Sequence, residues 1–168
     1  MITQALEWLQ PKPCLQRISL KHAWLENECI NGGAAGLAVH LSDRHWREFY
    51  DRCGHFLEET DQLLESYSDE VSPASLLTKL TVFKDLPIEM RDQWAQDVHR
   101  RFLANYRIPE TLDSLARARA EFGAILDDMA HVSGEADRRS SDRTRAFLEA
   151  GERMRDALGQ LPKWIPPL

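Results

Sequence analysis

The histidines and cysteines are the residues whose chemistry could bind a metal ion or attack a substrate. The chain has six histidines, and its three cysteines are Cys14, Cys29 and Cys53. A structural zinc site needs four ligands at compact spacing, whereas these cysteines are far apart and form no Cys-x-x-Cys motif. Cys53 and His55 are two positions apart, so they point in different directions on a helix. We predict no metal site, and free thiols instead of a disulfide framework.

Other catalytic patterns are also missing from the sequence. A di-iron bundle needs Glu-x-x-His on each of two helices, but Asp128 and His131 offer only one such spacing, with Asp in place of Glu. No Gly-x-Ser-x-Gly motif marks a nucleophile. The glycine-rich segment 31–36 follows a predicted helix and lacks the Lys-Ser/Thr pair of a phosphate loop. We therefore predict a non-enzymatic protein without cofactors.

The segment HFLEETDQLLESYSDE, residues 55–70, contains six acidic residues and no lysine or arginine. Four of the acids follow one another at three- and four-residue steps, which places them in one row along a helix: Glu58, Asp61, Glu65 and Asp69. We call these four residues the acidic row. Like charges at this spacing cost a helix roughly a few tenths of a kcal/mol per pair. Either neighbouring helices and water compensate the charge, or the row recognises a basic protein partner.

The overall charge argues against a general affinity for nucleic acid. The 168 residues include 21 basic and 27 acidic side chains, which gives a net charge of −6. A chain with this balance has no basic field to coat nucleic acid, so contact would need a partner or a local patch. Two local arginine groups support an alternative function, a regulatory or nucleic-acid-associated factor: Arg100 with Arg101, and Arg138 with Arg139.

The N-terminal segment has neither the basic start nor the apolar core of a signal peptide. No apolar run reaches the length that spans a bilayer. We therefore expect a cytoplasmic protein that does not associate with membranes.

Apolar residues at helical spacing recur along most of the chain. The clearest helix covers 43–68, where apolar positions repeat from Trp46 to Tyr67. The same reasoning, with caps and prolines, predicts further helices over 1–10, 19–31, 72–86, 87–106, 109–132 and 144–161. Segment 37–41 is ambiguous and is interpreted as a connector or helical turn, and 133–143 is interpreted as a loop.

These elements predict one all-α domain over residues 1–168, a helical bundle of six or seven helices with an extended tail at 162–168. A helical bundle does not by itself define a function. The acidic row supplies the functional hypothesis, a protein-binding module such as an inhibitor, immunity or adaptor protein that recognises a basic partner.

Overall fold

The computed structural model describes residues 13–70, 86–105 and 107–161, and within those ranges the regular structure is entirely helical. This confirms the predicted all-α class. The predicted helix at 1–10 and the tail at 162–168 lie outside the described residues, as does nearly all of the helix predicted at 72–86. The described part contains seven α-helices and one π-helix: α2 (Pro13–Trp24), η1 (Leu25–Ile30), α3 (Gly33–Leu41), α4 (Trp46–Glu70), α6 (Ile88–Asn105), α7 (Ile108–Ala130), α8 (Glu135–Arg138) and α9 (Ser141–Gln160).

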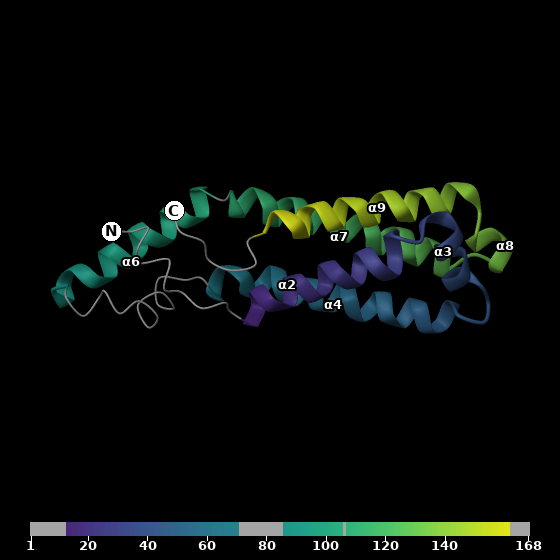
Figure 1. The fold of residues 1–168 in the computed structure, drawn as a ribbon, viewed down its shortest axis with the longest axis horizontal. Helices are drawn as coiled ribbons and strands as arrows, with labels where there is room; N and C mark the ends of the chain where they lie inside the picture. The colour runs from purple at the N-terminus through teal and green to yellow at the C-terminus, as the bar shows by residue number, and fades with distance from the viewer. Residues whose placement is uncertain (1–12, 71–85, 106, 162–168) are drawn as a thin grey trace.

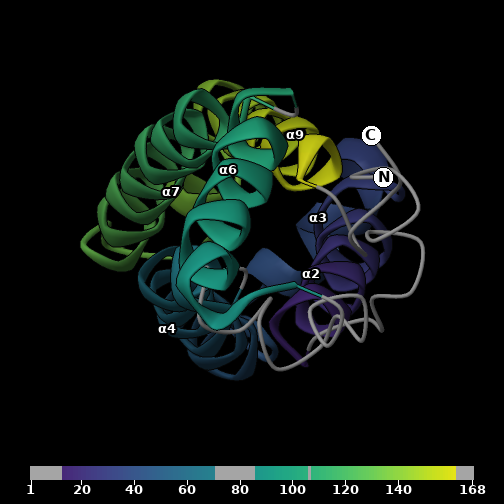
Figure 2. The same cartoon turned by 90° about the vertical axis from the view of Figure 1, so that its left-hand side faces the viewer.

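Four long helical segments form an up-down-up-down bundle. The segment made of α2 and η1 is antiparallel to α4, α4 is antiparallel to α7, and α7 is antiparallel to α9, as Figure 1 shows. The bundle closes because α9 packs back against η1 and α2. Seen from one end in Figure 2, α4 lies between α2 and α7. Helices α3 and α8 lie at one end of the bundle, and α6 extends beyond the other end (Figure 1).

Phenylalanines from three helices meet in the middle of the core. Phe122 of α7 lies 4.8 Å from Phe147 of α9 and 6.1 Å from Phe56 of α4, measured between ring centroids. Phe49 of α4 extends the cluster, at 5.9 Å from Phe147. Such offset and tilted aromatic pairs add to the free energy of apolar burial. Because α4 buries its side from Phe49 to Tyr67 in this core, its charged side faces outward.

Two predicted boundaries differ from the structure, and the structure decides one segment for which the sequence left two alternatives. The helix predicted from Ser19 begins at Pro13, because a proline is tolerated in the first turn of a helix. The ambiguous segment 37–41 belongs to α3, which packs Leu37 and Leu41 into the core and begins at Gly33 with φ +59°. The predicted loop 133–143 contains the short helix α8 and the first residues of α9.

Candidate functional site

The structure divides the acidic row. Glu58 is 75% exposed, and Nδ1 of His55 on the same helix lies 4.0 Å from its carboxylate. Glu65 is also exposed on the same helix. Asp69 lies within α4, but its side chain is outside the described residues. Asp61 is half-exposed and is compensated, because Arg119 of α7 donates from Nε and Nη2 to its two carboxylate oxygens at 2.8 and 3.0 Å.

A second acid of the same stretch has a partner from another helix. Lys21 of α2 places Nζ 3.0 Å from Oε2 of Glu59, although the lysine side chain is only 4% exposed. A buried ammonium group needs such a counter-charge. Neighbouring helices therefore compensate Asp61 and Glu59. They leave Glu58 and Glu65 without a lysine or arginine partner in the described part of the chain.

A groove of about 430 Å³ runs between α4 and α7 beside the acidic row. Three carboxylates line it, from Asp51 and Glu58 of α4 and Asp127 of α7. No lysine or arginine of the described residues lies within ion-pair distance of these three side chains. Gly54 keeps part of the groove open, since a Cβ there would have no atom within 4 Å. We call this feature the acidic groove.

Polar and apolar side chains of both helices line the acidic groove. The apolar part comes from the half-buried Tyr50 and from the small exposed portions of Leu57 on α4 and Leu126 on α7. The guanidinium group of Arg119 also borders the groove, and its bidentate contact with Asp61 fixes its position. The arrangement offers an apolar surface beside several carboxylates, which is the chemistry that holds a lysine or arginine side chain.

Sequence reasoning missed two of the groove acids. Asp51 lies seven residues, or about two helical turns, before Glu58. The helical spacing that defines the acidic row therefore already placed Asp51 on the same side of the helix. Asp127 gave no such signal, because only the packing of α4 against α7 brings it to the groove.

The arginine groups of the alternative function do not form one patch. Arg100 and Arg101 belong to α6, whereas Arg138 and Arg139 belong to α8 and the residue after it, at the opposite end of the bundle (Figure 1). Arg100 contacts Asp97, with Nη2 3.4 Å from the carboxylate.

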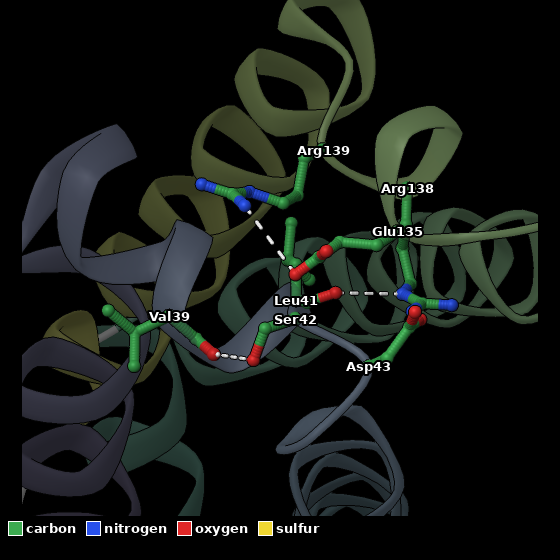
Figure 3. A network of polar contacts seen from close by, with 7 residues as sticks. All are labelled: Val39, Leu41, Ser42, Asp43, Glu135, Arg138 and Arg139. Atoms are coloured by element: carbon green, nitrogen blue, oxygen red, sulfur yellow. Dashed lines mark hydrogen bonds and ion pairs between the residues drawn. The ribbon is translucent and has the colours of Figure 1, made fainter.

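Arg138, one of the four arginines of the alternative function, is an internal residue and does not offer an exposed guanidinium group. Its side chain is buried, and Nε donates to the carbonyl oxygen of Leu41 at 3.0 Å while Nη2 donates to Asp43 at 2.6 Å (Figure 3). The guanidinium carbon lies 4.9 Å from the ring centroid of Trp46. This arginine fastens α8 to the junction of α3 and α4. The contact partners are almost a hundred positions away in the sequence, so local charge counting could not detect them.

The cysteines that the structure describes lie in the core. Cys29 and Cys53 are buried and free. A hydrogen bond with Cys53, together with burial, raises the pKa of the Cys29 thiol well above its ordinary value. A thiol that stays protonated is a poor nucleophile. Within the described residues, no three His, Cys, Asp or Glu side chains come together as a metal site.

The architecture defines the class as an all-α four-helix bundle with an acidic groove between two of its helices. No protein-family model, curated protein or solved structure matches the chain. In the part of the chain that is described, every helix is too short or too polar to cross a bilayer.

Proposed function

We propose that this chain is a non-enzymatic protein-binding module, of the inhibitor, immunity or adaptor kind, that binds a basic segment of a partner protein. The single observation that supports the proposal is the acidic groove, where Asp51, Glu58 and Asp127 lie together without a lysine or arginine partner among the described residues. Carboxylates that no internal cation compensates attract a cationic partner and help to determine its orientation.

The groove suits a lysine or arginine side chain. The aliphatic stem of such a side chain would lie along Tyr50 and the small exposed portions of Leu57 and Leu126, and its charged end would meet the carboxylates. Along α4 the exposed acids continue from Asp51 to Glu65, a rise of about 21 Å at 1.5 Å per residue. An extended segment of about six residues covers that length at roughly 3.3 Å per residue. The partner surface is therefore expected to be an extended basic segment.

The test is affinity capture with the full chain immobilised, from a lysate of its source cells, with bound proteins identified by mass spectrometry. The groove variant neutralises three charges while keeping side-chain shapes: Asp51→Asn, Glu58→Gln and Asp127→Asn. The control variant makes the same charge change at exposed acids of α6 and α7, outside the groove: Glu89→Gln, Asp92→Asn and Asp113→Asn. Circular dichroism and thermal unfolding establish that both variants remain folded.

We expect one stoichiometric basic protein to bind the wild type and the control variant but not the groove variant. With the purified partner, the three substitutions of the groove variant should raise the dissociation constant by about 3- to 150-fold, since exposed ion pairs contribute about 0.2–1 kcal/mol each. Binding should also weaken as salt screens the charges. A partner retained equally by the groove variant, or no stoichiometric partner at all, would refute the proposal.

A further inference from the structure

A second pocket lies on the other flank of α4, between α4 and α2, with a volume of about 320 Å³. Its charge is opposite to that of the acidic groove. Among the described residues, three permanent cations line it, Arg17 and Lys21 from α2 and Arg52 from α4, and Glu59 is the only acid. Three positive charges against one negative charge leave an excess of two positive charges. We call this pocket, together with Trp24 at its base, the basic pocket.

Two of the cations have nitrogen atoms in buried surroundings. Nε of Arg17 is buried without a hydrogen-bond partner among the described residues. Lys21 is almost completely buried and has its ion-pair contact with Glu59, which is itself exposed to water. A buried cation beside further cations raises the free energy of the pocket when no anion is bound. An anion in the pocket would offset the positive charge that Glu59 alone does not neutralise.

Two side chains contact the ring of Trp24 in this pocket. The guanidinium carbon of Arg52 lies 5.9 Å from the ring centroid of Trp24, and Trp24 stacks on Phe56 with centroids 5.0 Å apart. A guanidinium group over an aromatic ring keeps its in-plane N–H donors available for a carboxylate or phosphate. The exposed side chain of Leu20 extends the apolar surface next to it.

We propose that the basic pocket binds a small organic anion, whose carboxylate or phosphate group contacts Arg17 and Arg52 and whose apolar or aromatic body lies against Trp24. The volume lies at the lower end of the range of small-molecule sites, and the mixture of apolar surface with a few convergent polar groups is typical of them. This binding site is distinct from the acidic groove, which lies between α4 and α7, although His55 borders both.

The test uses the full chain labelled with ¹⁵N and follows the indole N–H signals of its five tryptophans. The Trp24→Phe variant assigns the signal of Trp24. The probes are benzoate, phenyl phosphate, inorganic phosphate and the neutral benzyl alcohol, each titrated at constant ionic strength. Arg17→Gln and Arg52→Gln remove the proposed anion contacts. Arg47→Gln is the matched control, because Arg47 is exposed on α4 and does not line the pocket.

We expect benzoate or phenyl phosphate to shift the Trp24 signal saturably, and benzyl alcohol to bind at least about tenfold more weakly. Arg17→Gln and Arg52→Gln should each weaken anion binding by about tenfold, as expected for a hydrogen bond to a charged group, and Arg47→Gln should leave it unchanged. The tighter of the two aromatic anions identifies the anionic group. The absence of a saturable shift would overturn the proposal, as would binding of benzyl alcohol as tight as that of the aromatic anions. Equal binding of inorganic phosphate and phenyl phosphate would also overturn it. So would equal effects of Arg47→Gln and Arg52→Gln on anion binding.

Discussion

Replacing Arg138 by alanine tests whether one buried guanidinium group holds the end of the bundle together. The substitution leaves the carbonyl oxygen of Leu41 without its donor in a buried position, which costs about 1–3 kcal/mol. Loss of the contact with the ring of Trp46 adds about 0.5–2 kcal/mol. The ion pair with Asp43 adds at most about 1 kcal/mol, because that carboxylate is 74% exposed. We expect Arg138→Ala to lower the free energy of unfolding by about 3 kcal/mol.

Urea denaturation followed by circular dichroism measures the change, and thermal unfolding checks it. For a chain of this size, about 3 kcal/mol corresponds to a decrease of roughly 6–12 °C in Tm. Asp43→Asn is the control for the exposed ion pair, and it should cost less than about 1 kcal/mol. Arg138→Lys should give an intermediate loss, since an ammonium group keeps the charge but cannot reproduce the planar arrangement of donors.

Two results would refute this reasoning about Arg138. A loss below about 1 kcal/mol in Arg138→Ala would mean that water replaces the guanidinium group at Leu41 without cost. An equal loss in Asp43→Asn would mean that the exposed ion pair, and not the buried hydrogen bond, carries the stabilisation.

Two further predictions concern single groups. Asp61→Asn should lower the free energy of unfolding by about 0.5–1 kcal/mol, because its bidentate contact with Arg119 is partly exposed. A double-mutant cycle with Arg119→Gln measures the coupling energy of the pair. If the losses of the two single variants add up to the loss of the double variant, the pair contributes nothing. Burial lowers the pKa of His99 below its ordinary value of 6.5. The unfolded chain therefore binds more protons at this residue, so its contribution to stability is complete above about pH 6.5 and is lost as the pH falls toward the folded pKa. Urea titrations at about pH 7.5 and pH 5 should show a smaller acid-induced loss in His99→Gln than in the wild type, and equal losses would contradict the assignment.

The sequence by itself determined the helical class and the long helices of the bundle. The three-four spacing of apolar residues is a local property of the chain, so it located most of α4, α6, α7 and α9 without knowledge of their neighbours. The sequence also indicated where α7 begins, because Pro109 is a residue typical of a first helical turn and lies in the first turn of α7. The outward position of the acids on α4 followed from the same periodicity.

Only the tertiary structure decided which charges have partners. Asp61 meets Arg119 across 58 positions of sequence, and Arg138 is withdrawn from the surface by partners at the junction of α3 and α4. Helical periodicity specifies the face on which a residue lies, but not which helix packs against that face or at what register. The acidic groove needs Asp127 from α7 beside α4, and the basic pocket needs Arg17 from α2 beside α4. Both sites depend on that packing. For this reason the spacing of residues along α4 indicated only part of the acidic groove and nothing of the basic pocket.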